Sequence, residues 1–203
     1  AVALLQRHLD RLAASAAYFD FPCDLDDVRA RLTQAVATAL EARLRVRLLL
    51  HEDGTVTVTT APQPAPAGEA VMRYVVSPTP VSSADPFLFH KTTRRQLYDS
   101  EHAIYAASHG ADEVVYLNER GELAEGSRTN IFVMRDGVLL TPPLSAGLLP
   151  GTLRSELLAS GTAVEATLTP DMLATAAAVY LGNSVRGLVR AEPIQAPPRS
   201  ASA

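Results

Sequence analysis

Apolar residues in the first forty positions recur every three or four residues, as they do along one face of an α-helix. The repeat covers 4–19 and again 28–40, and it predicts two helices. Pro22 ends the first helix, because proline has no amide hydrogen with which to continue it. Asp24 or Asp26 is the expected N-cap of the second helix, since a short acidic side chain accepts hydrogen bonds from the first amides.

The pattern then changes to the two-residue period of a β-strand. Leucine and valine at the even positions of 44–50 alternate with arginines at 43, 45 and 47, which predicts a strand with one buried face. Asp53-Gly54 predicts a hairpin turn, with a return strand through Val56 and Val58. After a loop rich in proline and alanine at 60–68, we expect a strand at 71–76 and a linker at 78–86.

In the second half of the chain, the sequence predicts helices and strands that follow one another closely. Helices are expected at 94–108 with Gly110 as C-cap, at 152–159, and from Thr169 to residue 173. Strands are expected at 114–117 and 179–181, and a hairpin of 131–134 and 138–140 turns at Asp136-Gly137. The sequence therefore predicts an α+β fold with a smaller lobe at 1–80, a larger lobe at 87–196 and a disordered tail at 197–203.

Composition narrows the classes of function. The 203 residues carry a net charge of −4 and their arginines are scattered, so no nucleic-acid partner is expected. No apolar stretch reaches the length of about 18 residues that a membrane span needs, so no membrane association is expected. No signal peptide is visible, which favours a cytoplasmic location, although the chain begins at Ala1 without a methionine. Cys23 is the single cysteine, so neither an internal disulfide nor a metal site is expected.

Lys91 is the single lysine among 18 basic residues. An arginine keeps its proton at ordinary pH, whereas a lysine amine can lose its proton and attack a carbonyl group to form a Schiff base. Lys91 is therefore a candidate for amine chemistry that arginine cannot replace. The alternative is that codon bias replaced the other lysines and left this one by chance.

Five segments carry a resemblance to a known family. They are HLDRL at 8–12, FHKTTRR at 89–95, ELAEGSRTNIF at 122–132, TPPLSAGLLPGTLR at 141–154 and YLGNSVRG at 180–187. In this order and spacing the chain resembles the class IV aminotransferases, which are pyridoxal-phosphate (PLP) enzymes of fold type IV, related to D-amino acid aminotransferase. HKTTRR and NSVRG look most like 4-amino-4-deoxychorismate lyase, particularly the lyase domains fused behind aminodeoxychorismate synthase components.

The resemblance implies a role for two residues in the chemistry. Lys91 is the amine that forms the Schiff base with PLP and later moves a proton at the substrate carbon. Glu125 is the carboxylate beside the pyridine nitrogen of PLP, where it keeps that nitrogen protonated so that the ring can accept electrons. The alternative for Glu125 is a solvated glutamate in a hairpin.

The resemblance also implies which residues bind the phosphate of PLP. Arg11 supplies positive charge, and the amides of Thr152 and Leu153 at a helix N-terminus supply hydrogen-bond donors. Asn183 and Ser184 fall where the family places another phosphate ligand. Arg11 could instead be an exposed helix arginine, and the Asn183-Ser184 pair could be a plain turn at the end of a strand.

Two further arginines are candidates for substrate binding. Arg186 lies near the expected substrate side, where its guanidinium could hold a carboxylate through two hydrogen bonds. Arg95 is four residues after Lys91, one turn along the following helix. Either arginine could instead be a structural ion-pair partner.

The implied reaction converts 4-amino-4-deoxychorismate to 4-aminobenzoate and pyruvate. The alternative, with the same Lys91 and Glu125, is an aminotransferase for branched-chain or D-amino acids, and a non-catalytic scaffold is a third possibility that the two residues oppose. The family has an N-terminal strand pair before the HLDRL segment that this sequence lacks, so the smaller lobe is incomplete at its start. The resemblance further implies a homodimer and a possible fusion to, or association with, an aminodeoxychorismate synthase component.

Overall fold

The computed structural model describes residues 2–39, 41, 43–63 and 70–194, and these fold into two units. The smaller unit is Ala1–Gly68 and the larger unit is Glu69–Ala203. The larger unit therefore begins before the predicted boundary at residue 80. The predicted tail at 197–203 lies outside the described residues.

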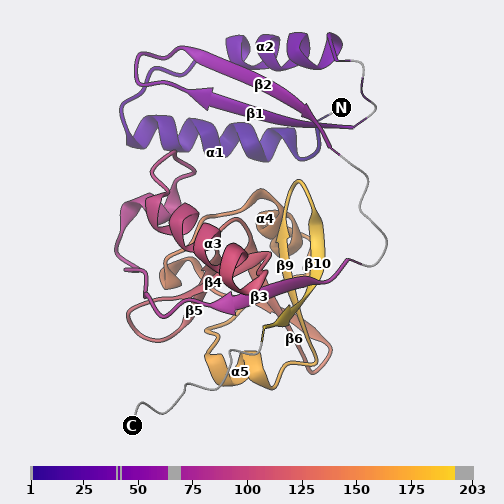
Figure 1. Cartoon of the computed structure of the whole chain (residues 1–203). Coiled ribbons are helices and arrows are strands. Elements are labelled where there is room, and N and C mark those ends of the chain that lie inside the picture. The colour runs from indigo at the N-terminus through magenta and orange to yellow at the C-terminus, as the bar shows by residue number, and fades with distance from the viewer. Residues whose placement is uncertain (1, 40, 42, 64–69, 195–203) are drawn as a thin grey trace. The chain divides into compact units, whose positions relative to one another are not determined.

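The smaller unit consists of two helices and a hairpin that share one apolar core (Figure 1). Its elements are α1 (Leu5–Tyr18), α2 (Leu25–Ala37), β1 (Leu44–Leu50) and β2 (Val56–Pro62). Asp24 is the N-cap of α2, and its carboxylate accepts hydrogen bonds from the amides of Asp26 and Asp27 at 2.9 and 3.2 Å. The antiparallel hairpin pairs Leu50 with Val56, so both predicted helices and the predicted hairpin are confirmed, and β2 runs three residues into the predicted loop.

The larger unit is built on an eight-stranded mixed sheet. Its strand order is β5-β4-β3-β10-β9-β6-β7-β8. The strands are β3 (Met72–Val76), β4 (Glu113–Leu117), β5 (Leu123–Gly126), β6 (Asn130–Arg135), β7 (Val138–Thr141), β8 (Ala163–Glu165), β9 (Ala178–Asn183) and β10 (Gly187–Pro193). The helices are α3 (Gln96–His109), α4 (Thr152–Ala159) and α5 (Pro170–Ala174), with short 3₁₀ turns at Pro86–Phe89 and Leu144–Ala146.

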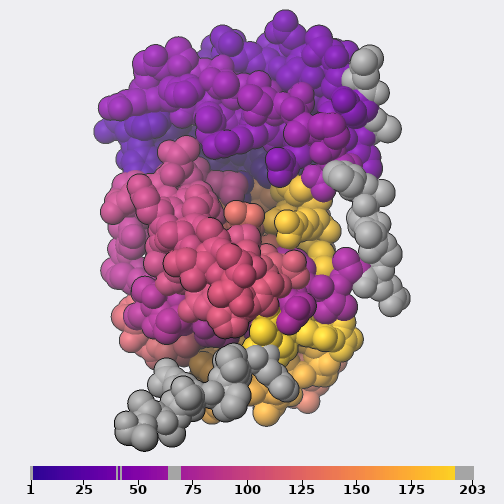
Figure 2. Space-filling model, viewed as in Figure 1, coloured from indigo at the N-terminus to yellow at the C-terminus, as the bar shows by residue number. Residues whose placement is uncertain are grey.

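Both faces of the sheet are buried around β4. Val115 packs into a core cluster with Ile131 and Leu181, whereas Val114 and Tyr116, on alternate positions, pack into a second cluster with Tyr98 of α3. Helix α3 lies against β4 in the cartoon (Figure 1), and the residues coloured as α3 occupy much of the near face of this unit in the space-filling view (Figure 2). This double burial explains why residues 114–117 of β4 are a continuous apolar run without alternation.

Two segments differ from the sequence-based expectation. Strand β3, expected in the smaller lobe, lies in the middle of the large sheet and pairs in parallel with both β10 and β4. The expected linker at 78–86 is ordered and belongs to the larger unit: Val81 is buried and forms a parallel bridge with Asn118. At the start of this segment, the hydroxyls of Ser77 and Thr79 each donate to the carboxylate of Glu101 at 2.6 Å.

Candidate active site

Glu125 is a buried carboxylate at the end of β5. Only 6% of its surface is exposed, and both of its oxygens accept hydrogen bonds. The hydroxyl of Tyr98 donates to one oxygen at 3.0 Å, and the amide of Leu149 donates to the other at 3.0 Å. The donors come from α3 and from the loop before α4, so three separate segments of the larger unit meet at this side chain.

The charge state of Glu125 is balanced between burial and its neighbours. Burial raises its pKa to about 7, while the hydrogen bonds from Leu149 and Tyr98 and the positive charges of Lys91 and Arg95 act in the opposite direction. The amine of Lys91 is therefore close enough to Glu125 to act on its charge. Lys91 itself is exposed, just after the 3₁₀ turn at Pro86–Phe89. The structure thus brings together the two residues that the sequence singled out for chemistry.

Arg95 has structural partners in this region. Its guanidinium donates a hydrogen bond to the carbonyl oxygen of Ser127, and it lies 3.6 Å from the carboxylate of Asp99 and 5.3 Å from the ring centroid of Tyr98. The hydrogen bond to Ser127 means that Arg95 supports the turn after Glu125. Its predicted contact with substrate remains a prediction.

The loop before α4 is fastened to the same region by Asn130. The side-chain amide of Asn130 donates to the carbonyl oxygen of Leu149 at 3.0 Å. A Cβ on Gly151 would lie 1.9 Å from the side-chain oxygen of Asn130, so only glycine fits at this position. Helix α4 therefore begins at Thr152 directly beside the segment that carries Glu125. The amides of Thr152 and Leu153 are in its first turn, where they have no acceptor in the helix itself.

The turn after β9 also contacts the segments around Glu125. The side-chain amide of Asn183 donates to the carbonyl oxygen of Arg128 at 3.1 Å, and its oxygen accepts from the amides of Val185 and Arg186 at 3.0 Å each. The Leu153 side chain lies against Gly182, where a Cβ would approach it to 3.0 Å. The predicted phosphate ligands Thr152, Leu153, Asn183 and Ser184 therefore lie on adjoining segments, and their contacts with phosphate remain predictions.

The two arginines predicted to bind substrate and phosphate, Arg186 and Arg11, differ in their surroundings. Arg186 is exposed, its guanidinium lies 3.9 Å from the sulfur of Met72, and it forms no ion pair with a carboxylate of the described residues. Arg11 lies on α1, in the smaller unit. Its predicted contact with the phosphate remains a prediction.

Three residues at the site were missed by sequence reasoning. Tyr98 lies on the buried face of α3, where an apolar role is the ordinary expectation. Leu149 contributes a backbone amide, which no side-chain pattern reveals. Glu113 accepts hydrogen bonds from the turn that follows Glu125, but its partners lie 14 to 16 positions away in the sequence.

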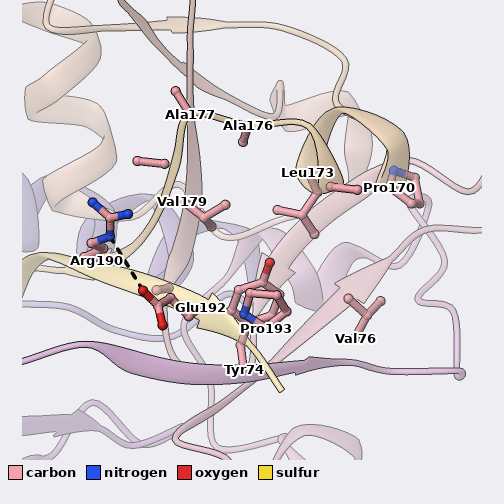
Figure 3. A pocket seen from close by; sticks show the side chains of 13 residues that line it. Tyr74, Val76, Pro170, Leu173, Ala176, Ala177, Val179, Arg190, Glu192 and Pro193 are labelled. Carbon is pink, nitrogen blue, oxygen red and sulfur yellow. Dashed lines mark ion pairs between the residues drawn. The ribbon is translucent and has the colours of Figure 1, made fainter. Parts of the chain in front are cut away.

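A separate hollow lies between α5 and the strands β3 and β10. It has a volume of about 380 Å³, and Tyr74, Leu173, Val179 and Pro193 are among its lining residues (Figure 3). Arg190 and Glu192 form an ion pair of 3.9 Å along one side of it. None of the predicted site residues lines this hollow, so it is distinct from the region around Glu125.

Comparison with known proteins assigns the family. The family model for amino-transferase class IV matches residues 1–194. The chain belongs to the class IV aminotransferases. This family depends on PLP, so PLP is the cofactor of this chain as well. The predicted α+β architecture of fold type IV is thereby confirmed, and so is the prediction of an enzyme.

Individual relatives have different names. A Schizosaccharomyces pombe protein named "Putative aminodeoxychorismate lyase" is 31% identical over 90% of this chain and 80% of its own length. The solved structure of a "Putative amino-acid aminotransferase" from Mesorhizobium loti is 42% identical, with a TM-score of 0.88 over 94% of this chain and 92% of that one. The T.th. branched-chain amino acid aminotransferase, solved with pyridoxamine 5'-phosphate, shares the fold with a TM-score of 0.80 at 20% identity, over 93% of this chain and 70% of that one.

The residues present fit PLP. A lysine amine lies near a buried carboxylate whose pKa of about 7 would let it ionise beside a protonated pyridine nitrogen. The first-turn amides of α4 adjoin the same region, and helix amides of this kind favour an anion.

Within the described part of the chain, no helix is long and apolar enough to cross a membrane.

Proposed function

We propose that this class IV enzyme is a PLP-dependent lyase that converts 4-amino-4-deoxychorismate to 4-aminobenzoate and pyruvate. The observation that carries the catalytic part of the proposal is the buried carboxylate of Glu125, which has two hydrogen-bond donors and the Lys91 amine as a neighbour. The KTTRR and NSVRG segments and the name of the S. pombe relative support the lyase reaction.

Lys91 and Glu125 carry the chemical steps in this proposal. Bound PLP would supply the electron sink that makes a proton on the substrate's amine-bearing carbon acidic. Lys91 holds the cofactor through its amine and then moves the proton at that carbon. Glu125 keeps the proton on the pyridine nitrogen, and its hydrogen bonds from Tyr98 and Leu149 keep the carboxylate in one orientation.

The reaction balances without a second substrate. The ring carbon that bears the amine loses a proton, and the ether bond between the ring and the enolpyruvyl group breaks. The ring becomes aromatic as 4-aminobenzoate, and the released enolpyruvate takes up a proton on its methylene carbon to become pyruvate. Because no keto acid is consumed, the enzyme needs only a proton-transfer residue near the cofactor, and Lys91 fills this role.

Binding groups surround this centre in the proposal. The amides of Thr152 and Leu153, the side chains of Asn183 and Ser184, and Arg11 from the smaller unit bind the phosphate. Arg186 binds a substrate carboxylate, because it is exposed and lacks an ion-pair partner among the described carboxylates. We further expect a cytoplasmic homodimer that acts in folate biosynthesis, with possible fusion to or association with an aminodeoxychorismate synthase component, as the resemblance to the lyases implies.

The second candidate is an aminotransferase for branched-chain or D-amino acids. The observation in its favour is the 42% identity to the M. loti protein, which carries an aminotransferase name. Lys91 and Glu125 would serve both reactions, so these residues do not discriminate between the two candidates.

One experiment separates the candidates. The protein, loaded with PLP, is given aminodeoxychorismate without any keto acid, and pyruvate and 4-aminobenzoate are measured over time. A lyase releases both products over many turnovers, whereas an aminotransferase stops after one half-reaction. Absence of pyruvate, together with rapid conversion of the cofactor to its amine form by an ordinary amino acid, would replace the lyase with the aminotransferase.

A further inference from the structure

A second buried carboxylate lies beneath the turn that follows Glu125. Glu113 is the first residue of β4, and only 1% of its surface is exposed. It forms no ion pair with a basic side chain of the described residues. An ionised carboxylate in such a position is costly unless hydrogen bonds replace the lost water. The hydrogen bonds that Glu113 accepts therefore decide whether its burial is tolerated.

The partners of Glu113 come mainly from residues 126–129, which we name the 126–129 turn. One carboxylate oxygen accepts from the Ser127 hydroxyl, and from the Val114 amide at 3.1 Å. The other accepts from the Arg128 amide at 3.2 Å and from the Thr129 hydroxyl at 2.9 Å. A Cβ on Gly126 would lie 3.1 Å from the Glu113 carboxyl carbon, so the turn wraps closely around the carboxylate.

This set of donors fits the ionised form of Glu113. Two of the four partners are backbone amides, which can only donate, and an ionised carboxylate can accept at both oxygens. Hydrogen bonds to a charged acceptor are also stronger than those between neutral groups. The four donors thus compensate for burial of the charge, and in return the carboxylate holds Ser127, Arg128 and Thr129 of the turn in place.

The 126–129 turn connects three parts of the candidate active site. Glu125 immediately precedes it. The carbonyl oxygen of Ser127 accepts the hydrogen bond from Arg95, and the carbonyl oxygen of Arg128 accepts the one from Asn183. A shift of this turn would therefore move the residue proposed for the pyridine nitrogen, a neighbouring positive charge and a proposed phosphate ligand at the same time.

We propose that Glu113 is a positioning residue of the PLP site, whose carboxylate holds the 126–129 turn so that Glu125, Arg95 and Asn183 keep their relative places. The inference rests on the proposed function only in taking the PLP site to lie around Lys91 and Glu125. It holds equally for a lyase and for an aminotransferase.

The test replaces Glu113 by glutamine, which keeps the size but offers one acceptor oxygen in place of two. In Glu113→Gln we expect PLP affinity to fall by about tenfold or more, which corresponds to the loss of one or two charge-assisted hydrogen bonds. At saturating PLP, kcat should fall by about tenfold while KM changes much less, because the misplaced group acts on the chemical step. Glu113→Asp, which keeps the charge, should restore part of both values.

Controls separate positioning from stability alone. Leu173→Ala removes a buried side chain of α5 and should lower the melting temperature without changing PLP affinity or kcat. If Glu113→Gln lowers only the melting temperature, as Leu173→Ala does, the proposal is wrong. Should Glu113→Gln not fold, Thr129→Val removes a single donor at similar volume, and wild-type PLP affinity and kcat in that variant would also refute the proposal.

PLP affinity is measured without substrate, so this experiment does not depend on the reaction. Wild-type protein that binds PLP but releases no pyruvate would remove the lyase assignment and leave the role of Glu113 to be decided by the affinity measurements. Reduced affinity in Glu113→Gln, with partial recovery in Glu113→Asp, would then still support the positioning role.

Discussion

Two turns adjoin the candidate active site, and they are held in opposite ways. In the 126–129 turn, Gly126, Ser127 and Thr129 are buried, and the hydroxyls of Ser127 and Thr129 donate hydrogen bonds to Glu113 inside the protein. The turn at 184–186 is open to solvent, with Val185 43% exposed and its backbone held by the Asn183 side chain. The first turn is therefore fixed by a buried carboxylate, and the second by one amide at the surface.

The difference suggests a division of roles between the two turns. A group that must keep one orientation toward the cofactor benefits from a buried, fully bonded support. A group that binds incoming substrate must be exposed, and Arg186 on the second turn is exposed and not paired with a described carboxylate. Changes at the first turn should therefore affect mainly kcat and PLP binding, whereas removal of the Arg186 side chain on the second turn should affect mainly KM.

The largest effect is expected from Glu125→Gln. Glutamine keeps the size and can accept hydrogen bonds, but it cannot hold a proton on the pyridine nitrogen. PLP should still bind, while kcat falls by about a hundredfold or more, as expected when a key electrostatic group of an active site is removed. Steady-state kinetics at saturating PLP measure this effect. Unchanged turnover would show that the pyridine nitrogen lies elsewhere.

Burial of Glu125 also predicts a pH dependence of stability. Because its pKa is raised to about 7, the folded protein binds a proton that the unfolded chain has already released. The stabilisation is present at low pH and is lost as the pH rises through 7. From pH 5 to pH 8, PLP-free wild type should lose roughly 2–3 kcal/mol of unfolding free energy relative to Glu125→Gln. Urea unfolding at both pH values measures this, and parallel changes in the two proteins would contradict the burial argument.

Much of this organisation was predictable from local patterns. Asp136 and Gly137 adopt positive φ angles of 50° and 77° at the expected hairpin turn, Gly110 has φ of 64° at the end of α3, and Thr169 accepts the capping hydrogen bond of α5. Each of these features depends on neighbouring residues in the sequence. Local chemistry is sufficient to specify turns and caps.

Long-range arrangements were not predictable in the same way. Strand β10 (Gly187–Pro193) mixes arginine and glutamate with small apolar residues, so no alternation marked it as a strand between β3 and β9. At the site, Lys91 was identified first as the single lysine and then through the resemblance, and Glu125 through the resemblance, whereas Tyr98 and Glu113 were missed. Their roles depend on partners brought together by folding, and a single sequence does not reveal those pairs.

Arg11→Ala, in the smaller unit, should reduce activity less than Glu125→Gln does. If Arg11 binds the phosphate, loss of one charge-assisted hydrogen bond should weaken PLP affinity by about ten- to a hundredfold. Saturating PLP should restore much of the activity, unlike in Glu125→Gln. Titration of PLP binding by absorbance gives the affinity. Unaltered affinity would mean that Arg11 is a helix residue with no role in cofactor binding.

The smallest effect is expected at the exposed turn. Arg186→Ala should raise KM by about tenfold and leave kcat and PLP affinity nearly unchanged, because one exposed charge-assisted hydrogen bond to substrate is lost. Arg190→Ala is the matched control, since Arg190 is also exposed but lies on β10 and pairs with Glu192. Equal KM values in the two variants would remove Arg186 from the substrate site and end the proposed division between the turns.

The central claim is that PLP is held by Lys91 beside the buried carboxylate of Glu125. The most direct measurement is reduction of the PLP-loaded protein with borohydride, followed by digestion and mass spectrometry. We expect loss of the visible absorption band and a pyridoxyl group on the peptide that contains Lys91, with no such label in Lys91→Ala, which should also lose nearly all turnover. A label at another amine, or normal turnover in Lys91→Ala, would show that Lys91 does not hold PLP.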